Sequence, residues 1–440
     1  MTWIPRRWTR WPKWQPQYKF VTVPLAFIHS PATLLRPAHV LEKHERYYLS
    51  YIVDEEIGFV RIRLTFVCLL IAACTSASAS GDNPPTLPIG TAAADFALRG
   101  IDGKTYHLDD FSASNVLVIV FTCNHCPTAQ LYEGRIKQLA ADFHDRGVAV
   151  VAIQPNDPKS VRLDEMGYTD LSDSFEEMKT RAAYRHFNFP YLYDGDTQST
   201  ARKYGPTATP HVFIFDRGRK LRYQGRIDSS AREALAKMHD ARGAIEALLA
   251  QKPVPHEKTP TFGCSIKWAS KEEGRAAEQA NIEKEPVNVE LVDAQGLKAL
   301  RKNAGGKLEL VDFWATWCGP CITQFPEFET MYRMYRRRPF DLITVSTNFP
   351  DEKKGVMAAL ERQHASSRNL LFGTTESYDL MAAFDPQWNA GVPYTVLIRP
   401  DGTVAFRHQG PIDPIELRRL ILANLPDDDY IGIRAHWSQQ

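Results

Sequence analysis

Two stretches of the chain show the same order of hydrophobic and polar patterns. In the second half, a buried-strand pattern at 307–315 runs into the motif Cys318-Gly319-Pro320-Cys321, and a helical pattern follows over 322–338. The segments after it predict, in order, a strand at 340–348, helices at 351–364 and 377–388, a hairpin at 394–408 behind Val392-Pro393, and an amphipathic helix at 414–425.

The first half repeats this order with a different sequence. A strand rich in Val, Leu, Ile and Phe at 115–122 ends at Cys123-Asn124-His125-Cys126, and a helix is expected up to residue 146. After it the pattern predicts a strand at 148–154, helices at 174–187 and 197–204, a hairpin at 211–224 behind Thr209-Pro210, and a long amphipathic helix at 229–250. The repeated order predicts two domains of one fold, 89–250 and 288–426, joined by a Pro-rich and charged linker at 251–287.

The composition agrees with two folded domains and excludes several classes of protein. A chain of 440 residues exceeds one compact core, and 44% hydrophobic with 24% charged residues is the balance of a folding chain. Lys and Arg number 53 against 52 Asp and Glu, so a nucleic-acid partner is not expected. Seven cysteines are too few for a disulfide scaffold, and four of them form two Cys-x-x-Cys pairs, which indicates chemistry.

The N-terminal segment predicts export rather than a folded domain. Residues 1–60 carry Trp and Arg among Pro without a helical or strand period, so we interpret them as unstructured or as a mis-assigned start. A Trp/Arg-rich membrane-binding segment is the alternative. Arg61 and Arg63 then precede an apolar run at 64–73, which is too short to span a bilayer, and Cys74 follows. This order is typical of an export signal over 61–79.

A lipid anchor is expected at the end of this signal. Ile71-Ala72-Ala73-Cys74 resembles the bacterial lipoprotein box, and the resemblance implies a lipid on Cys74 and attachment to a membrane. Cleavage at Ala77-Ser78-Ala79, which would release the protein, and a buried strand are the alternatives. Residues 80–88 are small, polar and Pro-rich, as a tether requires, and residues 427–440 are expected to be a tail.

The motif in the second half suits disulfide exchange. A helix that begins inside Cys-x-x-Cys places the first sulfur at the helix N-terminus, where unpaired N–H groups and the helix dipole favour a thiolate. One helical turn brings the second sulfur within bonding reach. We therefore expect Cys318 to attack a substrate disulfide and Cys321 to resolve the mixed disulfide. A zinc half-site or a static disulfide is the alternative.

Both halves resemble known families. Residues 288–426 resemble a thioredoxin-fold domain of the TlpA/ResA type, on the string Val311-Asp312-Phe313-Trp314-Ala315-Thr316-Trp317-Cys318-Gly319-Pro320-Cys321 and on Val392-Pro393. Residues 89–270 resemble a redoxin or AhpC/TSA-like domain of the same superfamily, on Phe121-Thr122-Cys123-Asn124-His125-Cys126-Pro127 together with Gly263-Cys264-Ser265-Ile266-Lys267-Trp268. The resemblance implies an α/β fold with two thioredoxin-like domains, each with a central mixed sheet flanked by helices. No cofactor and no metal are expected.

The resemblance also assigns roles to residues around the motif. In thioredoxins a buried aspartate on the preceding strand helps to move the proton of the second thiol, and Asp312 matches it, although a merely tolerated carboxylate is the alternative. Val392-Pro393 matches the cis-proline loop, which faces the dithiol and pairs with the substrate backbone. With Trp317, this loop is the expected substrate-binding group, and Thr209-Pro210 match it in the first half.

The motif of the first half departs from the thioredoxin pattern. Matched on the first cysteine of each pair, Thr122 stands at the position of Trp317, and Leu117 stands at the position of Asp312. His125 lies between the cysteines, where it either stabilises a thiolate or is a polar residue at a helix start.

Several roles stay open for the first pair. We expect Cys123 and Cys126 to be catalytic, with a soft metal such as Cu(I) on them as an alternative. A thiol peroxidase is less favoured, because Thr122 directly precedes Cys123 and no Pro comes earlier in the segment. Cys264 would either resolve a disulfide on this pair or be a buried apolar residue, and the sequence favours the second.

Together these patterns predict a thiol–disulfide oxidoreductase of the periplasm or cell envelope. Relatives of the TlpA/ResA type commonly reduce extracytoplasmic proteins, including apocytochromes. The resemblance therefore implies protein thiols and disulfides as partners, with an apocytochrome or a membrane electron donor as further candidates. A thioredoxin-fold module that only binds a partner or a soft metal is the alternative. The direction of electron flow depends on tens of millivolts and does not follow from the sequence.

Overall fold

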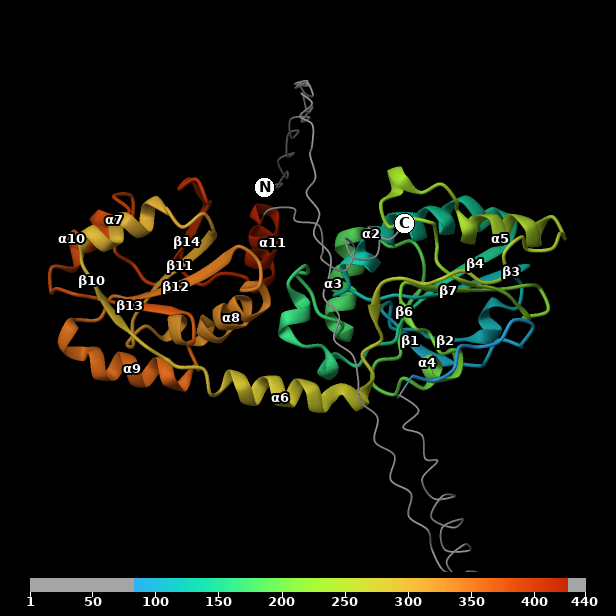
Figure 1. Cartoon of the computed structure of the whole chain (residues 1–440), viewed down its shortest axis with the longest axis horizontal. Coiled ribbons are helices and arrows are strands. Elements are labelled where there is room, and N and C mark those ends of the chain that lie inside the picture. Colours follow the sequence, from blue (N-terminus) through green and yellow to red (C-terminus); the bar gives the residue numbers. More distant parts are fainter. Residues whose placement is uncertain (1–82, 426–440) are drawn as a thin grey trace, which may run out of the picture. The chain divides into compact units, whose positions relative to one another are not determined.

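The computed structural model describes residues 83–425, which contain two mixed sheets flanked by helices (Figure 1). This confirms the expected α/β architecture. The predicted export signal at 61–79 with Cys74, and the predicted tail at 427–440, lie outside the described residues. Within the described range no helix combines the length and the hydrophobicity needed to cross a lipid bilayer.

The sheet of the first half has seven strands in the order β2-β1-β5-β4-β3-β7-β8. Its strands are β1 (Ala97–Gly100), β2 (Thr105–His107), β3 (Val116–Phe121), β4 (Val148–Gln154), β5 (Tyr191–Tyr193), β7 (His211–Phe215) and β8 (Leu221–Gly225). Its helices are α2 (Pro127–Phe143), α3 (Phe175–Arg185), α4 (Ser199–Tyr204) and α5 (Asp240–Leu249). The central β3 runs parallel to β4 and antiparallel to β7.

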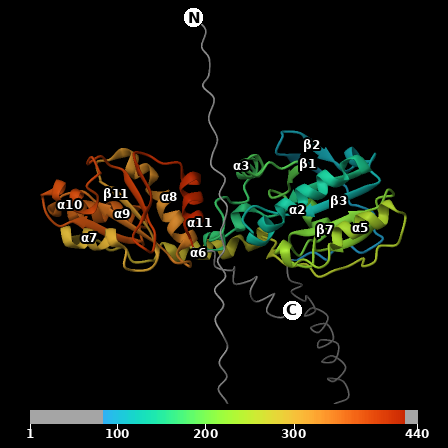
Figure 2. The same cartoon turned by 90° about the horizontal axis from the view of Figure 1, so that it is seen from above.

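Helices cover both faces of this sheet, which is why β3 is apolar throughout. Alternate strand residues point to opposite faces. Val116, Val118 and Val120 pack with α2, α3 and α5, whereas Leu117 and Ile119 pack on the other face with α4. Figures 1 and 2 show α2 and α5 on the same side of the sheet.

The sheet of the second half has six strands in the order β10-β13-β12-β11-β14-β15. Its strands are β10 (Glu290–Val292), β11 (Leu308–Trp314), β12 (Phe340–Ser346), β13 (Arg368–Phe372), β14 (Tyr394–Ile398) and β15 (Val404–Gln409). Its helices are α7 (Ala294–Lys302), α8 (Gly319–Tyr335), α9 (Lys353–Arg362), α10 (Ser377–Phe384) and α11 (Pro414–Asn424). The central β11 lies between β12, which is parallel to it, and β14, which is antiparallel.

Both faces of this second sheet are also covered. Leu310 of β11 packs in a cluster with α8 and α11, and Trp314 packs in a cluster with α8 and α9. Phe313 points to the opposite face, where α7 and α10 lie, and its ring centroid is 4.7 Å from that of Phe384. Each fully buried side chain of this size contributes roughly 1.5–3 kcal/mol to stability. The two covered faces therefore hold β11, and the motif that follows it, in a fixed position.

The helix expected at 229–250 is shorter than predicted, because α5 begins only at Asp240. Before it, the Ser229 hydroxyl accepts hydrogen bonds from the backbone N–H groups of Lys237 and Met238. Arg135 donates to the carbonyl oxygens of Ser230 and Ala231, which a helix would use internally. Side chains therefore form hydrogen bonds with backbone groups that would otherwise bond within a helix, and this stretch stays irregular.

Part of the expected linker at 251–287 is folded. It contains β9 (Cys264–Ser265), which pairs antiparallel with β6 (Ala208–Thr209), and the helix α6 (Glu272–Ile282). Ile266 and Trp268, just after β9, are buried in the cluster that contains α4. A strand of two residues leaves no periodic pattern, so the sequence did not indicate it.

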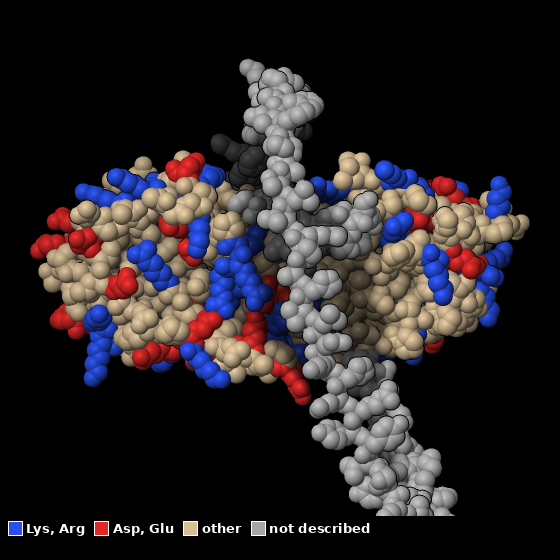
Figure 3. Space-filling view, viewed as in Figure 1, with Lys and Arg blue, Asp and Glu red and all other residues tan. Residues whose placement is uncertain are grey.

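Charges of both signs are interspersed on the face of the molecule that Figure 3 shows. The arginines near the C-terminal end of α8 also lie beside acidic residues. Arg333 forms an ion pair with Glu329 at 3.4 Å, and Arg336 forms one with Glu285 at 2.7 Å. Both arginines therefore have acidic partners within the fold, and Arg333 is itself buried, so these residues serve structural ion pairs.

Candidate functional site

The dithiol of the second half lies where β11 ends and α8 begins. Cys318 is the N-cap of α8, and its Sγ accepts a hydrogen bond from the backbone N–H of Cys321 at 3.3 Å. The two cysteines form a disulfide with an Sγ–Sγ distance of 2.02 Å. Cys318 keeps 5% of its surface exposed, whereas Cys321 is fully buried. Of the two cysteines, the one expected to attack substrates is thus the less deeply buried.

The expected substrate-binding residues lie around this dithiol. Trp317, directly before Cys318, is 68% exposed. Val392 packs against the buried cluster that contains both cysteines, and the Val392–Pro393 bond is cis, as the resemblance implied. Among residues 83–425, no strand pairs with Val392, which is partly exposed.

Asp312 is an ionisable group buried in the core beside this motif. It lies on the face of β11 that α8 covers, and it is completely buried. One carboxylate oxygen accepts a hydrogen bond from the Thr395 hydroxyl at 2.9 Å, and the other has no hydrogen-bond partner in the described part of the chain. Burial raises the pKa of Asp312 to about 8, against a smaller opposing effect of the Thr395 hydrogen bond. Asp312 therefore exchanges a proton near neutral pH.

Strand register shows which cysteine of the first half corresponds to Cys318. Val212, the second residue after cis-Pro210, lies opposite Val120 in β3. Thr395, the second residue after cis-Pro393, lies opposite Asp312 in β11. Cys126 follows Val120 by six residues, and Cys318 follows Asp312 by six residues. Each is the N-cap of a helix of 17 residues, α2 or α8. The structural counterpart of Cys318 is therefore Cys126, not Cys123.

This register corrects the match made from the sequence. Leu117 does not take the place of Asp312, because it points to the opposite face of the sheet. Val120 takes that place, and His125 rather than Thr122 takes the place of Trp317. The sequence match failed because the connection from strand to first cysteine is shorter in the first half, and an odd shift along a strand exchanges the two faces.

The two cysteines of the first half are reduced, buried and close to Thr209. Cys123 is 2% exposed and Cys126 is fully buried. The Cys126 Sγ accepts hydrogen bonds from the backbone N–H groups of Ala129 at 3.5 Å and Cys264 at 3.3 Å. As a thiol it donates to the Thr209 carbonyl oxygen at 3.3 Å, and the Thr209 hydroxyl lies 3.1 Å from the Cys123 Sγ. The Thr209–Pro210 bond is cis, as expected.

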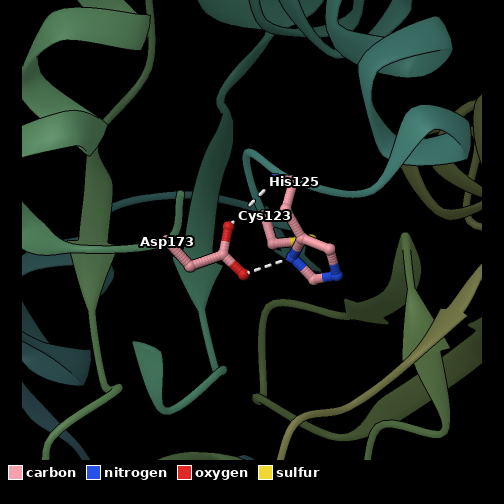
Figure 4. Close-up of side chains that lie close together, drawn as sticks. All are labelled: Cys123, His125 and Asp173. Carbon is pink, nitrogen blue, oxygen red and sulfur yellow. Dashed lines mark hydrogen bonds and ion pairs between the residues drawn. The ribbon is translucent and has the colours of Figure 1, made fainter. Parts of the chain in front are cut away.

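His125 forms a buried ion pair with Asp173 (Figure 4). Its Nδ1 lies 2.5 Å from Oδ2 of Asp173, and both side chains are almost completely buried. Asp173 also accepts hydrogen bonds from the backbone N–H groups of Asn124 and His125 and from the side chain of Asn156. Burial lowers the pKa of His125, but Asp173 outweighs it and holds this pKa above its usual value. Burial raises the pKa of Asp173, and His125 in turn holds it below its usual value.

This environment shifts the pKa values of the two thiols of the first pair in opposite directions. Burial raises the pKa of Cys123 well above its ordinary value, and the hydrogen bond with Cys126 adds to the rise. Burial also opposes ionisation of Cys126, but hydrogen bonds from the thiols of Cys123 and Cys264 and the charge of His125 outweigh it. The pKa of Cys126 is therefore held well below its ordinary value. Of the two thiols, Cys126 is therefore the one whose thiolate form this environment favours.

One group of side chains in the described range has the composition of a metal site. Ligand atoms of Cys123, His125 and Asp173 lie within 4.8 Å of one another (Figure 4). Both oxygens of Asp173 already accept hydrogen bonds from protein N–H groups. The carboxylate is thus occupied in holding His125 and the loop that carries Cys126. A soft ion on the cysteines, the alternative from the sequence, would therefore draw on sulfur ligands rather than on Asp173.

Two residues of this site were not predicted as site residues. Asp173 lies 48 residues from His125 in a polar segment without a motif, so nothing in the sequence pointed to it. Cys264 lies 138 residues from Cys126, and the sequence favoured a buried apolar role for it. It is partly exposed instead, and it packs against Cys123 and Cys126.

Comparison with known proteins agrees with this architecture. Residues 89–224 match the model of the AhpC/TSA family, and residues 285–420 match the Redoxin model. Thiol-disulfide oxidoreductase ResA of Bacillus thuringiensis is 31% identical over 74 residues, which are 17% of this chain and 43% of that protein. Thioredoxin-like protein YneN of Bacillus subtilis is 27% identical over 131 residues, 28% of this chain and 69% of that protein.

A solved structure also matches part of the chain. An uncharacterized conserved protein from Geobacillus kaustophilus is 38% identical, over 42% of this chain and 95% of that protein, with a TM-score of 0.38. The chain spans less than half the length of the ResA relative. The two family matches show that this chain carries two thioredoxin-fold domains, AhpC/TSA at 89–224 and Redoxin at 285–420, and it is distantly related to ResA. This confirms the pair of domains expected from the sequence.

Proposed function

We propose that this chain is an extracytoplasmic thiol–disulfide oxidoreductase that exchanges disulfides with proteins through Cys318 and Cys321. The observation that carries this proposal is the bonded pair at the N-terminus of α8, in which Cys318 keeps 5% of its surface exposed and Cys321 keeps none. The similarity to ResA, a thiol-disulfide oxidoreductase by name, supports protein thiols and disulfides as the substrates. An apocytochrome and a membrane electron donor are the partners proposed within this class.

The reduced protein acts in two steps. The Cys318 thiolate, stabilised by the N–H groups at the helix start, attacks one sulfur of the substrate disulfide and releases the other as a thiolate. Cys321 then attacks the Cys318 sulfur, which restores the internal disulfide and releases the second substrate thiolate. Asp312 in its carboxylate form takes the proton of Cys321, a role that its pKa of about 8 suits.

The substrate chain is held by two features beside the dithiol. The open edge at Val392 offers backbone groups to an extended segment, and the exposed ring of Trp317 offers an apolar surface next to the reacting sulfur. Neither feature requires a particular sequence in the substrate. The site is thus suited to exposed disulfides in chains that are not yet fully folded.

The proposal is tested by trapping. In the full chain with Cys321→Ser, the mixed disulfide of Cys318 cannot be resolved, so we expect a covalent adduct with an insulin chain at close to one per protein. Mass analysis under non-reducing conditions measures it. The matched control, Cys318→Ser with Cys321 intact, should yield less than about a tenth of that adduct, because buried Cys321 meets substrate poorly. Equal trapping by both variants, or by neither, would leave a thioredoxin-fold binding module as the better assignment.

We also propose that the protein is held at the cell envelope by a lipid on Cys74. The support is the order of Arg61 and Arg63, the apolar run at 64–73 and Ile71-Ala72-Ala73-Cys74. In a bacterial host that processes lipoproteins, the mature protein should begin at Cys74 and carry a diacylglyceryl group. Intact-mass analysis measures this, and Cys74→Ala should leave an unmodified protein in the soluble fraction. A mature N-terminus at Ser80 without lipid would show that the protein is released instead.

A further inference from the structure

A short strand of the chain itself covers the edge beside the dithiol of the first half. In β9, Cys264 lies opposite Thr209, the residue before cis-Pro210, and Ser265 lies opposite Ala208. The equivalent edge at Val392 in the second half has no strand partner among the described residues. The two halves thus differ in access, because a substrate chain cannot pair with Thr209 while β9 is in place.

The segment that carries Cys264 is a fixed part of the fold. A side chain at Gly263, where φ is +149°, would collide with the carbonyl oxygen of Thr209, so glycine permits the close approach. The Lys267 backbone N–H donates to Asn156 at 2.9 Å, and its ammonium group lies 2.6 Å from Glu165. Trp268 is fully buried. Displacement of this segment would expose these apolar and charged groups, so β9 stays docked.

Docked in this way, Cys264 connects the buried sulfurs with solvent. Its backbone N–H donates to the Cys126 Sγ at 3.3 Å, and its thiol forms a hydrogen bond with the same sulfur. Cys123 packs in the same cluster. Cys126 has no exposed surface and Cys123 has 2%, whereas Cys264 is partly exposed. A reagent in solution therefore meets Cys264 before it meets either member of the pair.

We propose that Cys264 is a third redox thiol, which carries disulfide bonds between solution and the buried Cys126 and Cys123. The external reactant is a low-molecular-weight or flexible disulfide that reaches the exposed side of Cys264. This role goes beyond the exchange proposed for Cys318 and Cys321 and does not depend on it.

The transfer balances as three exchanges. The Cys264 thiolate attacks an external disulfide, bonds to one sulfur and releases the other as a thiol. The Cys126 thiolate attacks Cys264, which releases the second external thiol and forms a Cys126–Cys264 bond. Cys123 then attacks Cys126, gives its proton to Cys264 and leaves a Cys123–Cys126 disulfide. One external disulfide is reduced to two thiols, and two protein thiols are oxidised to one disulfide.

The test uses the full chain, fully reduced and then mixed with glutathione disulfide. Samples are quenched with acid at intervals, and disulfides are mapped by mass spectrometry of peptides. In Cys123→Ser, no thiol at position 123 can attack the Cys126–Cys264 disulfide. We therefore expect this disulfide in most molecules and no lasting glutathione adduct. In Cys264→Ser, oxidation of Cys123 and Cys126 should be at least about tenfold slower, because glutathione disulfide must reach buried sulfurs.

Oxidation of Cys318 and Cys321 is followed in the same samples as an internal reference. It should proceed at the wild-type rate in both variants, so a folding defect or a failure of the second-half site is recognised separately. Cys264→Ala is measured beside Cys264→Ser because it removes the thiol without adding a hydroxyl; both variants keep the backbone N–H that contacts Cys126. Lasting glutathionylation of Cys126 in Cys123→Ser, or wild-type oxidation of Cys123 and Cys126 in both Cys264 variants, would overturn the proposal.

Discussion

Replacement of Cys318 with serine is expected to lower the rate of insulin reduction by at least about a hundredfold. A serine hydroxyl is not ionised near neutral pH and cannot form the mixed disulfide. Cys321, which is fully buried and lacks the N-cap position, cannot substitute for it. The rate is measured with the full chain as the onset of insulin precipitation under a fixed reductant, after subtraction of the rate without protein.

The control for this experiment is a partly exposed position on the same helix. Thr330→Ser in α8 should keep the wild-type rate, since Thr330 is partly exposed, its hydroxyl donates to the Pro326 carbonyl oxygen, and serine keeps that hydroxyl. If Cys318→Ser keeps more than about a tenth of the activity and a further Cys126→Ser removes it, the first half carries turnover. That result would reverse the roles proposed for the two halves.

The sequence predicted the framework of both sheets because the decisive patterns are local. Apolar runs such as β3 and β11 are buried on both faces, and each is followed by a helix with one apolar side, so strand, motif and helix could be located. The start of α5 could not be predicted. At its expected start, the Ser229 hydroxyl and Arg135 of the distant helix α2 form hydrogen bonds with backbone groups that a helix would bond internally. Such competition depends on contacts that periodicity does not contain.

The two candidate sites also differ in how far local sequence predicts them. The site at Cys318 is built by consecutive residues around one helix start, and its cis-proline loop has a recognisable sequence, so it could be predicted. The first-half site depends on strand register, which decides that Cys126 is the N-cap. It also depends on Asp173 and Cys264, which reach the pair only through long-range folding. A shift of a few residues in the connection was enough to mislead a match based on spacing.

Asp312→Asn is expected to remove a pH dependence from the stability of the protein. Burial raises the pKa of Asp312 from 3.8 to about 8, so the folded state holds this proton more tightly than the unfolded state. Above about pH 4 the unfolded chain releases the proton and the folded chain does not, so wild-type stability falls as pH rises. The fall from this group should approach about 1.4 kcal/mol per pH unit and end near pH 8. The asparagine side chain of the variant does not titrate, so its contribution to stability is the same at every pH.

The measurement is equilibrium urea unfolding of both proteins at several pH values from 4 to 8, with the Cys318–Cys321 disulfide intact. Other titrating groups are common to both proteins, so the difference between the two curves isolates Asp312. The variant should gain stability relative to wild type steadily with pH, even if the amide loses about 1–3 kcal/mol at every pH through an unsatisfied N–H. Glu361→Gln, which makes the same chemical change at an exposed position of α9, should follow the wild-type slope. Parallel curves for wild type and Asp312→Asn would mean that Asp312 is already ionised in the folded protein. Its proton affinity would then be too low to accept the proton of Cys321, and the second exchange step would need another base.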